Sequence, residues 1–115
     1  MKNLTIKRSK WIHTKKDLET QSKLHRKSDG KMCCLGFLTK ACGIPVKKFS
    51  GFGTVEDVGL KRLPKTLQWL VNNSYPSSDA FKAMKINDSN MLRKNKEKRI
   101  KTIFKRHGIN VKFVD

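Results

Sequence analysis

Four lysines near the end of the chain are spaced so that they share one face of a helix. Lys94, Lys98, Lys101 and Lys105 stand four, three and four residues apart, and at about 100° per residue they fall within about 60° of one another. Lysines at these spacings repel, and the only nearby acid, Glu97, is expected to offset part of that repulsion by pairing with Lys101. A row of positive charges alone favours binding to phosphates. Phosphate contacts position a protein on nucleic acid without recognising the base sequence.

The N-terminal segment adds a second basic region in which an aromatic residue is interleaved. Trp11 has two interpretations: its ring stacks on unpaired bases, or it closes a small core. If the two ends of the chain pair as strands, this segment lies beside the lysine row and extends it into one positive face. The basic residues of the segment are Lys7, Arg8, Lys10, Lys15 and Lys16.

Cys33, Cys34 and Cys42 are the candidates for metal binding or nucleophilic catalysis. A metal site is not expected, because no Cys-x-x-Cys or Cys/His spacing occurs and Cys33 and Cys42 would project in nearly opposite directions from a helix. A thiol in the first turn of a helix has a lowered pKa, and any of the three histidines would serve as its base. The surrounding apolar run instead favours core cysteines. We therefore predict no enzyme and no cofactor.

Composition explains why the positive charge needs a partner. The chain has 115 residues, and its 27 Lys and Arg against 9 Asp and Glu give a net charge of +18. Self-repulsion of this size destabilises a compact state, so it indicates an anionic partner. Nucleic acid is the commonest such partner, followed by a membrane surface or an acidic protein. Solubility alone is the remaining explanation.

The same composition limits the class of protein. Residues of apolar type make up 37% of a chain that is long enough for one domain. No apolar run is long enough to cross a membrane, and no apolar segment follows the basic N-terminus as a secretory signal would require. An odd number of cysteines fits reduced thiols. We expect a cytoplasmic protein without a membrane partner.

The expected helices and strands, which must position these residues, indicate an α+β fold. We expect a single domain, 1–115, with a basic, less ordered region at 1–28 and a core at 29–115. Period-two alternation predicts short terminal strands around Leu4 and Ile6 and around Val111 and Phe113. These strands are expected to pair in a small sheet. Several short helices would surround a central buried helix at about 32–42, which Gly43 ends.

The remaining segments carry helix and turn signals. Residues 44–62 are rich in glycine and predict a loop, with a short hairpin as one option. A helix is expected after Pro64, and another is expected after Ser78 as its N-cap. Asp88 or Ser89 would cap the last helix, which stops at Gly108.

One stretch resembles a known group of proteins. Residues 29–38 read Asp-Gly-Lys-Met-Cys-Cys-Leu-Gly-Phe-Leu, and they are similar to the Asp-Gly-x-x-Cys-Cys-Leu-Gly-x-Leu motif of small phage and prophage proteins of unknown function. The similarity continues through Leu63-Pro64, Asn87-Asp88 and Gly108-Ile109. The resemblance implies a phage origin and a bacterial host cell, and it implies no mechanism.

Three functions follow from these observations. The leading hypothesis is a small basic phage-type protein that binds nucleic acid, or a nucleic-acid-containing host assembly, through its lysine-rich terminal regions. The alternative is an inhibitor or modulator of a host protein that docks on an acidic surface with the same lysines. A cysteine-dependent enzyme is the second alternative.

Overall fold

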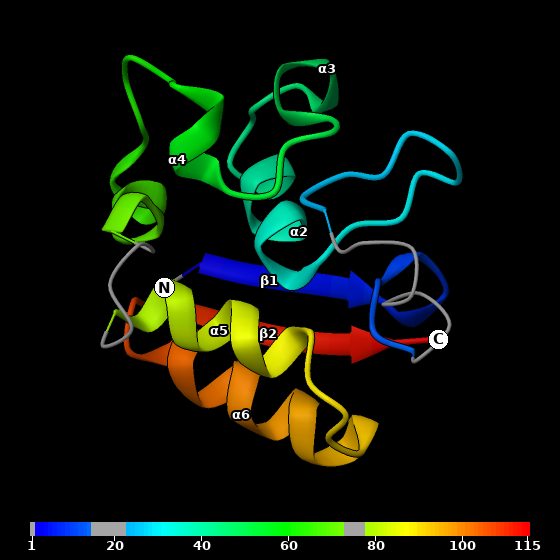
Figure 1. Cartoon of the computed structure of the whole chain (residues 1–115). Helices are drawn as coiled ribbons and strands as arrows, with labels where there is room; N and C mark the ends of the chain where they lie inside the picture. The colour runs from blue at the N-terminus through cyan, green and yellow to red at the C-terminus, as the bar shows by residue number, and fades with distance from the viewer. Residues whose placement is uncertain (1, 15–22, 73–77) are drawn as a thin grey trace.

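The two ends of the chain pair with each other in a parallel two-stranded sheet. A computed structural model describes residues 2–14, 23–72 and 78–115. Strand β1 (Lys2–Lys7) runs beside β2 (Ile109–Val114), with Lys2 opposite Ile109 and Lys7 opposite Val114. The termini therefore lie at opposite ends of the sheet (Figure 1). The predicted α+β fold and the terminal sheet are confirmed.

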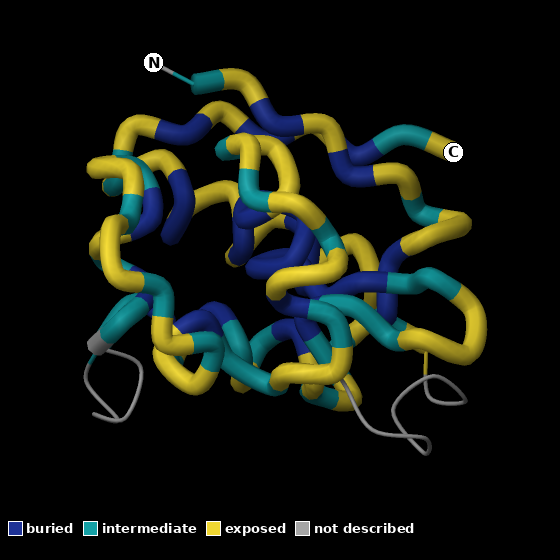
Figure 2. Tube along the Cα trace, turned by 90° about the horizontal axis from the view of Figure 1, so that it is seen from above, coloured by how far each residue is buried: buried dark blue, intermediate teal, exposed yellow. Residues whose placement is uncertain are grey.

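Helices cover one face of this sheet. Side chains alternate along both strands, so that Leu4, Ile6, Ile109, Val111 and Phe113 are buried and their neighbours on the other face are mostly exposed. Helix α2 contacts β1, helix α6 contacts β2, and α5 packs between the two helices. In Figure 1 α2 is drawn above β1 and α6 below β2, with α5 crossing in front of β2, and in Figure 2 many of the buried segments lie in the interior of the trace.

The central helix is α2 (Cys34–Ala41), within the predicted range of 32–42. Its residues from Cys34 to Thr39 are buried, which agrees with an apolar pattern on most sides. Gly43 follows in a left-handed conformation with a φ of 89°, and Pro45 prevents the helix from continuing. The core therefore forms around this short helix.

The glycine-rich region contains two single-turn helices, α3 (Val46–Phe49) and α4 (Val55–Val58). The hairpin option was wrong. Thr54 caps α4 through its side chain, and Gly59 ends it with a φ of 70°, so local capping determines the turn. The expected helix after Pro64 is present as the 3₁₀ helix η2 (Lys65–Asn72).

The last two helices are α5 (Asp79–Asn87) and α6 (Arg93–Lys105). Ser78 accepts a hydrogen bond from the Phe81 amide and caps α5 as predicted. The cap predicted for α6 was wrong, because α6 begins after Leu92 without a side-chain cap. Asp88 instead ends α5, and the Ser89 hydroxyl donates to the Ile86 carbonyl.

The segment that follows β1 belongs to the core. After the short 3₁₀ helix η1 (Arg8–Lys10), Trp11 and Ile12 are fully buried, and so is Leu24. The Trp11 indole donates to Asn87 Oδ1 at 2.8 Å. The described residues before position 29 are therefore part of the same packed domain as the rest. Lys15 and Lys16 lie outside the described residues.

Candidate functional site

The predicted lysine row, Lys94, Lys98, Lys101 and Lys105, lies on the exposed side of α6. The opposite side of the helix is buried through Ile100, Ile103 and Phe104, so the apolar stripe fixes which way the lysines point. At 1.5 Å per residue the row is about 16 Å long, the axial length of roughly five phosphates in one strand of duplex DNA.

The single acidic residue of α6 is turned away from this row. Glu97 is 8% exposed and receives two hydrogen bonds of 2.9 Å from Arg8, one to each carboxylate oxygen. Arg93 adds an ion pair at 3.4 Å. Arg8 holds the carboxylate and is the main cause of its lowered pKa, while Lys101 acts on Glu97 through a smaller coulombic effect, so the predicted interaction with Lys101 is present but is not the principal one. The exposed charges of α6 are consequently all positive.

Lys101 has a different neighbour. Its ammonium lies 5.9 Å from the centre of the Phe113 ring on β2, within the range of a cation–π contact. Phe113 in turn packs against Trp11, with ring centres 4.8 Å apart. The lysine row thus contacts the sheet at this point through an aromatic ring, while Lys101 as a residue stays exposed.

The described N-terminal residues of the predicted site divide into three groups. Lys7 and Lys10 are exposed and remain candidates for binding. Arg8 is committed to structure, because it also donates to Asp115 at 2.8 Å, and its place in the predicted site is withdrawn. The interpretation of Trp11 as a stacking residue was wrong, since a fully buried ring offers no face to a base. Through Arg8 the segment does lie against α6, as expected.

Beside the row lies a buried lysine that was not among the predicted site residues. Lys96 is 1% exposed, and its ammonium donates to the carbonyls of His13 at 3.1 Å, Asn87 at 2.8 Å and Ser89 at 2.9 Å. Burial lowers the pKa of Lys96. The signal was present, because residue 96 is four and seven residues before Ile100 and Ile103 and so shares their apolar face.

Asn87 completes this buried polar centre. Its Oδ1 accepts from the Trp11 indole and from the Cys34 amide at 3.1 Å, and its Nδ2 donates to the Ile12 carbonyl at 2.9 Å. A buried amide with all of these partners fixes the relative positions of the N-terminal segment, α2 and α5. Asn87 and Lys96 therefore hold α6 and its lysines in place.

The cysteines lie in or against the core. Cys33 and Cys34 are buried, and burial raises the pKa of Cys33 to about 12 and that of Cys34 well above its ordinary value. Cys42 is half-buried at the end of α2, and its pKa is also raised by burial. Thiols in these surroundings favour the packing interpretation over the nucleophilic one.

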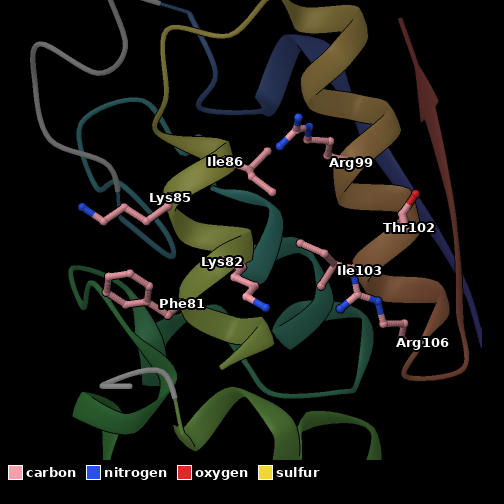
Figure 3. A pocket seen from close by; sticks show the side chains of 8 residues that line it. All are labelled: Phe81, Lys82, Lys85, Ile86, Arg99, Thr102, Ile103 and Arg106. Carbon is pink, nitrogen blue, oxygen red and sulfur yellow. The ribbon is translucent and has the colours of Figure 1, made fainter. Parts of the chain in front are cut away.

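A second cationic feature, which the sequence did not indicate, lies between α5 and α6. The two helices border a groove of about 470 Å³ (Figure 3). Its basic side chains come from both helices, because the groove depends on how α5 packs against α6. They are Lys82, Lys85, Arg99 and Arg106.

Comparisons with known proteins add no assignment. Nothing matches this chain among protein-family models, curated proteins or solved structures. Within residues 2–14, 23–72 and 78–115 no group of three or more His, Cys, Asp or Glu side chains is arranged to hold a metal ion. In the same part of the chain, no helix has the length and apolar character needed to span a membrane. Function must therefore be argued from the surface of α6.

Proposed function

We propose that this protein binds nucleic acid through the phosphate backbone, with the lysine row of α6 as the principal contact. The observation that carries the proposal is the one-signed exterior of this helix. Its only acid faces inward onto Arg8, while Lys94, Lys98, Lys101 and Lys105 face solvent. Lys7 and Lys10 extend the basic surface from the adjoining segment.

The chemistry of the row defines the mode of binding. Ammonium groups neutralise phosphates and release condensed counterions, which provides affinity and makes it dependent on salt. They do not read base edges, because lysine acts as a point charge without a fixed fork of donors. In this mode the protein binds nucleic acids of many base sequences with similar affinity. Such binding suits a small phage-type protein that acts on nucleic acid or on a nucleic-acid-containing host assembly.

The test is a titration of fluorescently labelled duplex DNA at several salt concentrations, followed by anisotropy. Four phosphate contacts predict a slope of log K against log salt of roughly −3 to −4. A variant with all four row lysines changed to glutamine should lose most of this slope. The matched control changes four other exposed lysines to glutamine and alters the net charge equally. Those four are Lys47, Lys48, Lys61 and Lys65.

Two results would overturn the proposal. One is the absence of binding to DNA and RNA at about 50 mM salt, where phosphate contacts are strong. The other is an equal loss of affinity in both quadruple variants, which would reflect net charge and not a defined interface. Docking on an acidic host protein would then become the leading function.

A further inference from the structure

The groove between α5 and α6 combines an aliphatic floor with cations on both sides. Ile86 of α5 and Ile103 of α6 point toward each other across it (Figure 3). Lys82 stands on the α5 side, and Arg99 and Arg106 stand on the α6 side. Its volume of about 470 Å³ is within the range of pockets that bury apolar groups of a ligand.

The positive charge of the groove is largely unbalanced. Arg106 pairs with Asp79 at 2.9 Å. Within the described residues, Lys82, Lys85 and Arg99 have no carboxylate at ion-pair distance, and the Lys85 ammonium lies 5.4 Å from the centre of the Phe81 ring. An occupant must therefore present apolar groups to the floor and negative groups to both sides.

These features fit a protein segment better than a nucleic acid. Unpaired bases bind by stacking on aromatic rings, but the floor is aliphatic. Among the described residues that line the groove, Phe81 has the one aromatic ring, and Lys85 lies over it. A nucleic-acid strand also carries its phosphates along one line, whereas these cations flank the apolar floor on two sides. An amphipathic helix with acids on both edges of its apolar stripe matches that arrangement.

We propose that the α5–α6 groove binds an acidic amphipathic helix of a partner protein. Apolar side chains of the partner occupy the space above Ile86 and Ile103, and its carboxylates meet Lys82 on one side and Arg99 on the other. This site is separate from the lysine row, because Arg99 and Arg106 lie about 120° around α6 from the centre of the row. The proposal therefore does not depend on nucleic-acid binding.

The probe is a labelled synthetic peptide of about five helical turns, with a leucine stripe flanked by glutamates. Its control has the same composition with leucines and glutamates distributed around the helix. We expect the striped peptide to bind about tenfold more tightly than the control peptide, because only the striped peptide places its apolar groups together in the groove. Equal affinity for the two peptides would overturn the proposal, since charge alone would then explain binding.

Matched charge reversals locate the peptide on the protein. The double variant Lys82→Glu with Arg99→Glu should bind the striped peptide about tenfold more weakly. The double variant Lys98→Glu with Lys105→Glu has the same net charge and should bind it nearly as well as the parent. All four side chains are exposed, so both variants should keep the parent melting temperature within a few degrees.

Oligothymidylate binding separates the remaining outcomes. If the variant Lys82→Glu with Arg99→Glu loses oligothymidylate binding and the variant Lys98→Glu with Lys105→Glu keeps it, the groove is part of the nucleic-acid interface. That result would overturn the proposal. If the two double variants bind the striped peptide with the same affinity, the groove is not the peptide's binding site. A failure of DNA binding with intact selective peptide binding would overturn only the proposed function of the lysine row.

Discussion

Gly36 of α2 lies directly against the carbonyl group of Leu24. A Cβ atom at residue 36 would be 1.8 Å from the Leu24 oxygen and 2.7 Å from its carbonyl carbon, distances that no packed structure accommodates without moving the backbone. Glycine at this position lets the helix approach the preceding segment, which buries Leu24 and Leu35. This contact gives a physical reason for the glycine in the Cys-Cys-Leu-Gly sequence.

Gly36→Ala should destabilise the fold by about 3 kcal/mol, the upper end of the usual cost of overpacking. Thermal unfolding followed by circular dichroism measures the change. Gly53→Ala is the control, because residue 53 has open space for a Cβ atom and no left-handed backbone. Equal melting temperatures for the two variants would mean that α2 does not pack on Leu24 as described.

Lys96→Met should also destabilise the protein, by about 3 kcal/mol, because it leaves the buried carbonyl of Asn87 and the partly buried carbonyls of His13 and Ser89 without their common donor. Lys94→Met is the matched control, since that side chain is exposed two residues earlier on the same helix. Denaturant unfolding gives both free energies. A stable Lys96→Met variant would contradict the buried position of the ammonium.

The ion pair of Arg8 with Glu97 predicts an acid-sensitive contribution to stability. The pKa of Glu97 is lowered from its ordinary value of 4.5, mainly by the Arg8 hydrogen bonds, so the folded state favours the carboxylate. This contribution is present above pH 4.5 and is lost as the pH falls through the lower pKa of the folded state. Glu97→Gln removes it.

Melting temperatures of the parent and of Glu97→Gln should therefore converge as the solution is acidified. Asp29, whose pKa is lowered to about 2 by Arg26, titrates in both proteins and does not affect their difference. A constant difference in melting temperature from neutral pH to about pH 2 would show that the Glu97 carboxylate gains nothing from Arg8 in the folded state.

The thiols should differ in their reactivity toward an alkylating reagent. Cys33 and Cys34 are buried with raised pKa values, so they should be labelled only when the protein unfolds. Cys42 is partly accessible and should be labelled first, though slowly, because its pKa is also raised. Mass spectrometry of labelled peptides distinguishes the three sites. Rapid labelling of Cys33 or Cys34 in the native protein would support the hypothesis of a cysteine-dependent enzyme.

The sequence predicted those features that depend on local periodicity. Alternation around Leu4 and Val111 indicated strands with one buried face, and the apolar run ending at Gly43 indicated α2. The exposure of the lysine row followed from the buried stripe that contains Ile100. In each case a repeating pattern of burial acts within a single element, so no knowledge of distant contacts is needed.

Features that depend on distant contacts could not be predicted in this way. The partner of Glu97 is Arg8, which is 89 residues away, and a local i,i+4 rule selected Lys101 instead. The α5–α6 groove requires Lys82 and Arg99 to be brought together by helix packing. Ser89 looked like a cap for α6, but its hydroxyl and carbonyl bind Ile86 and Lys96.

Lys98→Glu tests whether the lysine row exists for binding and not for folding. The parent lysine is repelled by Lys94 and Lys101, whereas glutamate would attract both, so the free energy of unfolding should rise by about 0.5 kcal/mol. Affinity for duplex DNA should fall for every sequence, since a phosphate contact becomes a repulsion.

Lys98→Gln is the intermediate case and should reduce the salt slope by about one unit. Denaturation and anisotropy titrations of the same two variants measure both effects. Opposite changes in stability and in DNA affinity are the expected result, because a row of like charges costs the fold stability and contributes binding energy when phosphates lie against it. If Lys98→Glu gained stability and kept its full DNA affinity, the lysine row would not be the interface.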